Sequence, residues 1–274
     1  MRLAISNIAW DVSEDEPISR LLEQYKIDAI DVAPGKYFPD PLQANLKEVK
    51  LVREWWESRG IKIVGMQALL FGSTGLNVFG ESKVQRAMLE RLAAVCAIAA
   101  VLGATRLVFG SPKNRDRSGL SDHEADAIAV PFFERLGDIA KAEGVTVCLE
   151  PNPPCYGANY MMTTAQTAQV VRLVGHASIK LQLDTGALTI NHEDVVTELI
   201  GNAQLVGHVH ASEPDLLPLG DGATNHTMIS AALRRYLPNQ VVSIEMLATS
   251  KEAHCLSIER ALKVATESYR VASN

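Results

Sequence analysis

Four side chains of metal-binding type end four successive apolar segments in the second half of this sequence. They are Glu150 in VTVCLEPNP, Asp184 in IKLQLDTGAL, His210 in LVGHVHASE and Glu245 in QVVSIEML. Each short apolar run is typical of a strand buried on both faces, and turn residues and a helical stretch follow it. In a parallel sheet all four side chains emerge at the same, carboxyl end. Three carboxylates and one imidazole that converge there repel one another unless a divalent cation neutralises them.

The composition favours one soluble, self-sufficient domain. A chain of 274 residues that is 47% hydrophobic can bury a full core, so we expect one domain over residues 1–274. The net charge of −6 gives no electrostatic reason to bind a nucleic acid. The longest apolar stretch, LAAVCAIAAVLG, is too short to cross a membrane. Four cysteines without C-x-x-C spacing, and an N-terminus that runs directly into a strand pattern, favour the reducing cytoplasm.

Eight repeats of a strand followed by a helix run through the chain. Helical patterns such as ESKVQRAMLERLAAVCAIAAVLG alternate with apolar runs, and no linker divides them. Eight units averaging about 34 residues predict an α/β fold, the closed (β/α)₈ TIM barrel. An open doubly wound sheet lacks support, because no Gly-rich fingerprint follows the first strand. The expected strands are Leu3 to Trp10, Ala29 to Pro34, Ile61 to Leu69, Arg106 to Gly110, Val145 to Glu150, Ile179 to Asp184, Leu205 to His210 and Val241 to Leu247.

Glycines and polar residues mark the expected helix ends. Glycines just before the strands suit left-handed C-caps, and short polar side chains suit N-caps. The C-cap candidates are Gly60, Gly103, Gly144 and Gly175, and the N-cap candidates are Ser121, Asp122 and Thr163.

Strand parity predicts which neighbours share the interior with the four candidate ligands. Side chains two residues apart lie on one face of a strand. The inward pairs are therefore Cys148 with Glu150, Gln182 with Asp184, His208 with His210, and Ser243 with Glu245. His208 and Gln182 are expected to orient the ligands by hydrogen bonds.

The segments LEPNP, LDTG, HVH and SIEM, in this order, resemble the xylose-isomerase-like barrel superfamily of sugar isomerases and epimerases. The likeness covers nearly the whole chain, and LVFGSPKNR is similar to many members that are called sugar phosphate isomerase/epimerase. The resemblance implies that Glu150, Asp184, His210 and Glu245 hold one divalent cation. Manganese is favoured, and Mg²⁺, Co²⁺ or Zn²⁺ would also fit. It further implies that Glu150 and Glu245 perform the proton transfers.

Elementary chemistry supports the same reaction. A cation that chelates the carbonyl and hydroxyl oxygens of a sugar stabilises the enediolate formed when the adjacent proton leaves. Glu150 and Glu245 would remove and return that proton. Its return to the opposite face epimerises the carbon, and its return to the neighbouring carbon isomerises the sugar.

The sequence departs from the ketose 3-epimerase pattern where those relatives grip their substrate. Ala187, Leu216 and Tyr156 stand where a His, an Arg and a Glu are typical. A modified, larger or phosphorylated sugar is therefore favoured over a free ketohexose. The DNA-repair branch of the superfamily requires further zinc ligands, which are replaced here by Gln67, Gly110, Ala223 and Asn225.

Substrate contacts are predicted at the mouth of the barrel, with a structural alternative for each. Trp10 would stack on a sugar face or cover the barrel end, and His208 would serve the substrate or be an ordinary interior histidine. The remaining candidates are Lys36, Lys113, Arg115 and Asn152; the pair Lys113 and Arg115 would clamp a phosphate or carboxylate, or lie in a solvated loop.

The sequence thus predicts a cytoplasmic, metal-dependent sugar isomerase or epimerase. Its expected partner is a small carbohydrate, with no nucleic acid and no membrane, and a homo-oligomer is left open. Two alternatives use the same barrel: a metal-dependent lyase such as a keto-inositol (inosose) dehydratase, and a non-catalytic sugar-binding protein. Loss of water from the substrate would indicate the first, and binding without hydrogen exchange would indicate the second.

Overall fold

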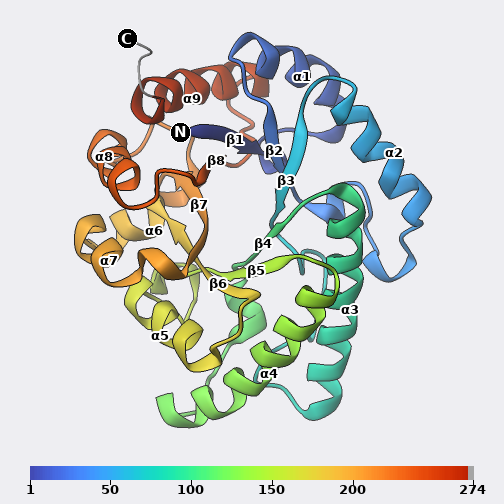
Figure 1. Ribbon diagram of the computed structural model, residues 1–274, viewed down its shortest axis with the longest axis vertical. Helices are drawn as coiled ribbons and strands as arrows, with labels where there is room; N and C mark the ends of the chain where they lie inside the picture. The colour runs from blue at the N-terminus through green and yellow to red at the C-terminus, as the bar shows by residue number, and fades with distance from the viewer. Residues whose placement is uncertain (271–274) are drawn as a thin grey trace.

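Eight parallel strands close into a barrel in chain order, as Figure 1 shows for the computed structural model, which describes residues 1–270. The predicted (β/α)₈ barrel is confirmed, because β1 pairs with both β2 and β8. The strands are β1 (Arg2–Ser6), β2 (Ala29–Val32), β3 (Lys62–Met66), β4 (Arg106–Phe109), β5 (Thr146–Leu149), β6 (Ile179–Asp184), β7 (Val206–Ser212) and β8 (Val241–Glu245).

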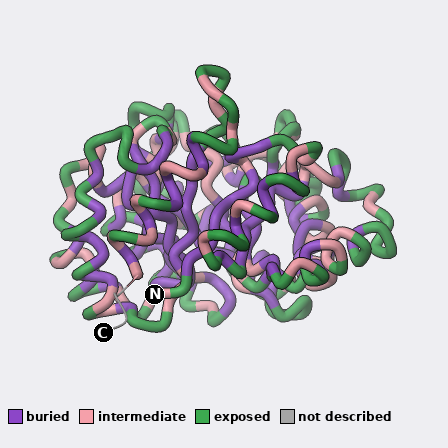
Figure 2. The backbone as a smooth tube through the Cα atoms, turned by 90° about the horizontal axis from the view of Figure 1, so that it is seen from above, coloured by how far each residue is buried: buried purple, intermediate pink, exposed green. Residues whose placement is uncertain are grey.

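Helices surround the barrel and cover the outer face of its strands (Figure 1). Buried residues are concentrated in the interior of the molecule, in the strands and on one side of the surrounding helices (Figure 2). Within residues 1–270, no helix combines the length and the apolar character that a membrane crossing requires. The helices are α1 (Asp15–Gln24), α2 (Leu46–Glu57), α3 (Ser82–Leu102), α4 (Asp122–Ala142), α5 (Thr164–Val174), α6 (Thr185–Ile190), α7 (Val195–Asn202), α8 (His226–Tyr236) and α9 (His254–Tyr269).

The helix boundaries follow from local capping chemistry. Ser121 caps α4 in a reciprocal capping box with Glu124, and Thr163 caps α5 through the backbone N–H of Gln166. Gly103 ends α3 in the left-handed conformation at φ 84°, which a residue without Cβ adopts at little cost. The prediction of Asp122 as an N-cap is wrong by one position, because it is the first residue of α4.

The first strand is shorter than the sequence pattern predicts. It ends at Ser6, whose hydroxyl accepts a hydrogen bond from the N–H of Ile8 and begins a single helical turn, Asn7–Ala9. Trp10 therefore lies beyond this turn instead of at the strand end. An apolar run such as IAW has no strand periodicity that separates it from a buried turn, which explains the error.

Strand register places the candidate ligands side by side. Asp184 on β6 pairs with His210 on β7, and Ser212 on β7 pairs with Glu245 on β8. Every residue of β7 is buried, as expected for a strand covered on both faces. The barrel thus delivers three of the candidate ligands, together with Ser212, from adjacent strands to one end of its interior.

Candidate metal and active site

The structure brings the four candidate ligands together at the carboxyl end of β5 to β8. One potential ligand atom from each of Glu150, Asp184, His210 and Glu245 lies within 4.8 Å of the others. The Nδ1 atom of His210 is 3.3 Å from Glu150 Oε1 and 3.2 Å from Glu245 Oε2. His210 is fully buried, whereas each carboxylate residue keeps 7–8% of its surface exposed. The cluster therefore lies in a largely dry interior that still opens to solvent on its carboxylate side.

Asp184 is held by the start of the short helix that follows it. Its Oδ1 accepts a hydrogen bond of 2.6 Å from the N–H of Ala187, and its Oδ2 accepts one of 2.7 Å from the hydroxyl of Ser212. The same Ser212 hydroxyl accepts a bond of 2.9 Å from the N–H of Gly186. The carboxylate is thus both the N-cap of α6 and a fixed member of the cluster.

Two residues from the first half of the barrel determine how the side chains of Glu150 and Glu245 are placed. The Nε2 of Gln67 donates a hydrogen bond of 2.8 Å to Glu245 Oε1, which leaves Oε2 turned toward His210. Gly110 lies beside Glu150, and a Cβ at this position would overlap Glu150 Oε2. In the sequence, Gln67 and Gly110 stand out only as replacements of the zinc ligands of the DNA-repair branch. Their positions after the third and fourth strands were the signal that they face the same mouth.

The crowded charges shift the pKa values of the cluster. Burial, then the charges of Glu245 and Glu150, raise the pKa of Asp184 to about 8. Burial disfavours the charged form of His210, yet Glu245 and the neighbouring carboxylates raise its pKa well above the usual value. Burial also acts against the ionised form of Glu245, but the charge of His210 and the bond to it lower that pKa. One imidazolium cannot neutralise three carboxylates at this spacing.

The residues present fit a divalent cation. Carboxylate oxygens and one imidazole nitrogen form a hard donor set that suits Mn²⁺, Mg²⁺ or Zn²⁺. Glu150 Oε1 is buried without a hydrogen-bond partner among the described residues, so it has an unused lone pair directed at the cluster. A cation there would satisfy this oxygen and offset the repulsion that, together with burial, raises the pKa of Asp184.

Trp10 and Lys36 do not present the groups that their predicted substrate contacts require. Trp10 has no exposed surface; its indole N–H donates a bond of 2.7 Å to Asp15, and its ring packs edge-on against Trp56. The ammonium of Lys36 donates to the backbone carbonyls of Asn7 and Trp10. These side chains hold the loop after β1, because buried polar groups are paired within the protein.

Arg115 and Asn152 support Glu150 from behind. Arg115 is completely buried, which contradicts both the phosphate clamp and the solvated loop predicted for it. Its guanidinium donates a bond of 2.7 Å to the backbone carbonyl of Glu150 and a second bond to the side-chain oxygen of Asn152. Asn152 in turn donates to Glu150 Oε2 at 3.4 Å. Lys113, on the same loop, is exposed to solvent.

His208 and Gln182 lie in the barrel interior beneath the cluster. His208 donates a hydrogen bond of 2.7 Å to Asp31 of β2, a residue that the sequence analysis did not single out. Burial opposes ionisation of Asp31, but the charge and bond of His208 hold its pKa well below the usual range. With its amide oriented for bonding, Gln182 accepts from the N–H of His210 at 3.2 Å and donates to the carbonyl of His208 at 3.3 Å.

Tyr156 and Leu216, which depart from the ketose epimerase pattern, lie in the loops after β5 and β7 at the mouth of the barrel. Tyr156, which is 39% exposed, accepts a hydrogen bond of 2.7 Å from the N–H of Asp215. This bond links the loop after β5 to the loop after β7. Asp215 and Leu216 both have positive φ, at 59° and 52°. Asn225 caps α8 through the N–H of Met228, so it has a structural use in place of a zinc-ligand role.

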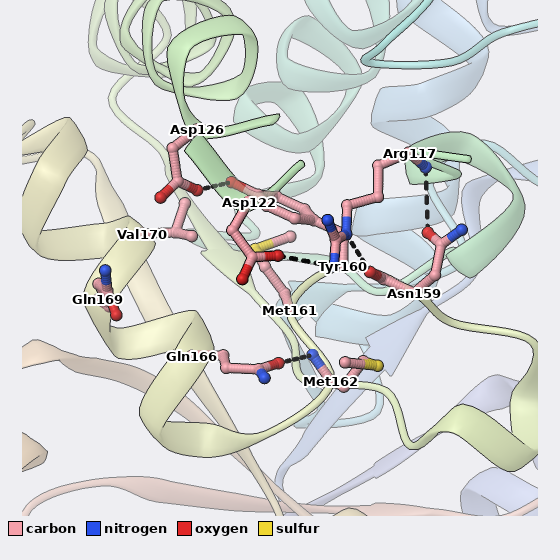
Figure 3. A pocket seen from close by; sticks show the side chains of 10 residues that line it. All are labelled: Arg117, Asp122, Asp126, Asn159, Tyr160, Met161, Met162, Gln166, Gln169 and Val170. Carbon is pink, nitrogen blue, oxygen red and sulfur yellow. Dashed lines mark hydrogen bonds and ion pairs between the residues drawn. The ribbon is translucent and has the colours of Figure 1, made fainter. Parts of the chain in front are cut away.

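A cavity of about 110 Å³ lies away from the cluster, between the first turns of α4 and α5 (Figure 3). Its polar groups bond to one another: Arg117 pairs with Asp122 at 2.7 Å, and the Tyr160 hydroxyl donates to Asp126 at 2.9 Å. A second cavity, of about 390 Å³, lies between α1 and α2 and is lined partly by Trp55. Neither cavity contains a residue of the candidate metal cluster.

Comparisons with known proteins define the class to which this barrel belongs. The sequence matches the family described as Xylose isomerase-like TIM barrel over residues 19–267, so the chain belongs to that family. No curated protein matches the sequence.

Solved structures share the fold over nearly the full chain. A D-psicose 3-epimerase crystallised in the presence of D-fructose has a TM-score of 0.81 at 19% identity and covers 98% of this chain and 99% of its own. The 3-keto-D-glucoside 4-epimerase YcjR from E. coli has a TM-score of 0.77 at 16% identity, with 96% and 99% covered. The IOLI protein with a bound zinc atom has a TM-score of 0.77 at 19% identity, with 98% of each chain covered. At these identities the likeness establishes the fold.

Proposed function

We propose that this protein is a divalent-metal-dependent isomerase or epimerase of a sugar or sugar derivative. The observation that carries the proposal is the convergence of Glu150, Asp184, His210 and Glu245 within 4.8 Å at the carboxyl end of the strands. Active sites of (β/α)₈ barrels lie at that end. Two structural neighbours are described as epimerases and a third as holding zinc, which fits the same reading.

The two glutamates are proposed to be the proton-transfer residues. Each directs one oxygen at His210 Nδ1, and its other oxygen accepts from an amide: Gln67 for Glu245, and Asn152 for Glu150. The bound cation would polarise the substrate carbonyl and so acidify the neighbouring C–H. One glutamate then removes that proton and the other returns one to the opposite face of the carbon. Glu150 directly follows β5 and Glu245 ends β8, so the two carboxylates approach the cluster from two different strands, as this exchange needs.

A glutamate that ligates a cation is a weaker base, because the cation lowers its proton affinity. The second carboxylate oxygen and the dry surroundings offset this effect. Only 8% of the surface of Glu150 and of Glu245 is exposed, so water competes little for their lone pairs. Gln67 and Asn152 hold the second oxygens in place and thereby orient the proton-accepting groups.

We further propose a substrate that is modified or larger than a free ketohexose. The apolar residues Ala187 and Leu216 stand where ketose 3-epimerases typically have a histidine and an arginine. Neither side chain can therefore bond to the hydroxyl groups of a free ketohexose. Lys113 is the exposed cation of the loop after β4 and is proposed as a contact for an anionic substituent.

The test is hydrogen exchange into substrate in D₂O. Protein stripped with chelator and reloaded with Mn²⁺ would be incubated with ketoses, their phosphates, 3-keto-glycosides and keto-inositols, and followed by proton NMR. The proposal expects exchange at the carbon next to the carbonyl, with an epimer or isomer as product, only in the metal-loaded protein. Loss of water would indicate a lyase. Binding without exchange across the panel would contradict a catalytic role.

A further inference from the structure

A second buried polar pair lies in the barrel interior directly behind the candidate metal ligand His210. Asp31 of β2 has no exposed surface and His208 of β7 has 2%. The imidazole Nε2 of His208 donates a hydrogen bond of 2.7 Å to Asp31 Oδ2. Burial of an ionised carboxylate costs free energy unless the carboxylate is paired. The position of Asp31 in the barrel interior therefore calls for an explanation.

The carboxylate faces the nitrogen of His210 that points away from the cluster. Asp31 Oδ2 lies 3.8 Å from His210 Nε2, while His210 Nδ1 faces Glu150 and Glu245 at 3.3 and 3.2 Å. Within the described chain, His210 Nε2 and Asp31 Oδ1 are buried and have no hydrogen-bond partner. The imidazole of His210 therefore lies between Asp31 on its Nε2 side and the two glutamates on its Nδ1 side.

The surrounding residues preserve this arrangement. A Cβ at Gly65 of β3 would overlap Asp31 Oδ1, so a glycine is needed for the carboxylate to fit. The rings of His208 and His210 meet edge to face, with centroids 5.3 Å apart and planes at 78°. The ring of His210 packs against His208 in this orientation with its Nε2 toward Asp31 and its Nδ1 toward the cluster.

We infer that Asp31 is a positioning residue for the metal ligand, with His208 as the residue that holds it. An imidazole that coordinates a cation through Nδ1 must carry its proton on Nε2, and a carboxylate behind Nε2 favours that tautomer and ring orientation. The inference rests on the proposed function, since it requires the cation at Nδ1. It assigns to β2 and β3, which carry none of the four ligands, a part in metal affinity.

The first test is Mn²⁺ binding by isothermal titration calorimetry in Asp31→Asn. The amide keeps the size of the side chain and removes the charge, so we expect the Kd to rise by about 10- to 100-fold. Asp15→Asn is the matched control. Asp15 is also a buried carboxylate that accepts two hydrogen bonds, but it lies on α1, outside the barrel. Its Kd should equal that of the wild type, whereas an equal rise in both variants would indicate a general loss of packing and overturn the inference.

A second variant covers the case in which Asp31→Asn does not fold. Asp31→Asn/His208→Gln replaces the pair with two neutral amides that can bond to each other, and it should show the same loss of affinity. In the zinc-loaded wild type, ¹⁵N NMR should find the His210 proton on Nε2, and a proton on Nδ1 would place the cation on the other ring nitrogen and overturn the inference. Wild-type protein that binds no Mn²⁺ would contradict the proposed function. Wild type that binds Mn²⁺ and exchanges substrate hydrogen, beside variants of unchanged affinity, would overturn this inference alone.

Discussion

The two halves of the barrel use polar side chains differently. In the half formed by β5 to β8, carboxylates and an imidazole converge, and Glu150 Oε1 has no hydrogen-bond partner among residues 1–270. In the half formed by β1 to β4, two of the charged groups predicted to grip a substrate are bonded to the protein: Lys36 to backbone carbonyls, and Arg115 to the carbonyl of Glu150. Lys113, also predicted, is exposed to solvent. A charged side chain that is bonded to the protein's own backbone supports the site, whereas carboxylates that converge on one point mark the candidate site itself.

The largest expected effect follows from neutralising a proposed proton-transfer residue in the second half. Glu150→Gln and Glu245→Gln should each lower kcat by about 10²- to 10⁴-fold, because a carboxamide cannot accept the proton. Glu143→Gln, a change at an exposed glutamate that ends α4, is the control. Circular dichroism should show the barrel intact in all three. Near-normal turnover in either active-site variant would exclude its assigned role.

Removal of a ligand from the same half should abolish stable metal binding. Asp184→Ala and His210→Ala each delete one of the four converging groups, so elemental analysis after dialysis should find far less metal than the roughly one ion per chain expected of the wild type. Retention of the full metal content by both variants would place the ion elsewhere.

A substitution of Gly110, in the first half, should alter metal binding in the second half. In Gly110→Ala the new methyl group occupies the position of Glu150 Oε2 and forces that carboxylate to move. We expect the Kd for Mn²⁺ to rise by about tenfold, as for other residues that orient ligands. Gly201→Ala is the matched control, since a Cβ there meets nothing within 4 Å. Equal affinities in the two variants would show that the halves are less connected than the structure indicates.

The stability of the metal-free protein should depend on pH through the second half. The pKa of Asp184 is raised to about 8 in the folded state, so folded protein holds a proton that unfolded protein releases near pH 4. This contribution to stability is complete below about pH 4 and is lost as the pH rises toward 8; His210, also raised, acts in the same direction. The lowered pKa of Glu245 acts oppositely below pH 4.5.

Thermal melts from pH 5 to pH 8 would measure this dependence. The Tm of the chelated protein should fall as the pH rises across that range, and Mn²⁺ should raise the Tm most at pH 8, where the ligands are most readily deprotonated. A chelated protein that gains stability toward pH 8 would contradict the charge repulsion described for the cluster.

The smallest effect is expected at the exposed rim of the first half. Lys113→Ala should change KM for a neutral sugar by less than about twofold, because an exposed charge in water contributes little. A larger rise in KM confined to phosphorylated sugars would assign the lysine to an anionic substituent. Steady-state kinetics on matched pairs of free and phosphorylated substrates would separate these outcomes.

The sequence predicted the barrel well because strand and helix periodicity, together with capping residues such as Ser121 and Gly103, are local signals. It also predicted the convergence of four side chains, since parallel strands must end at one face. It did not predict the burial of Arg115 or the pair of Asp31 with His208. Arg115 and Asn152 are 37 positions apart in the sequence, and Asp31 and His208 are 177 positions apart. No local sequence signal distinguishes a buried arginine from a solvated one.

The absence of a side chain at Gly110 affects which residue can occupy position 150 in related barrels. Because this glycine leaves room for one carboxylate oxygen of Glu150, the two positions form a single unit of variation. A homologue with any larger side chain at the first position must turn its glutamate elsewhere, so substitutions at the two sites should be correlated in an alignment.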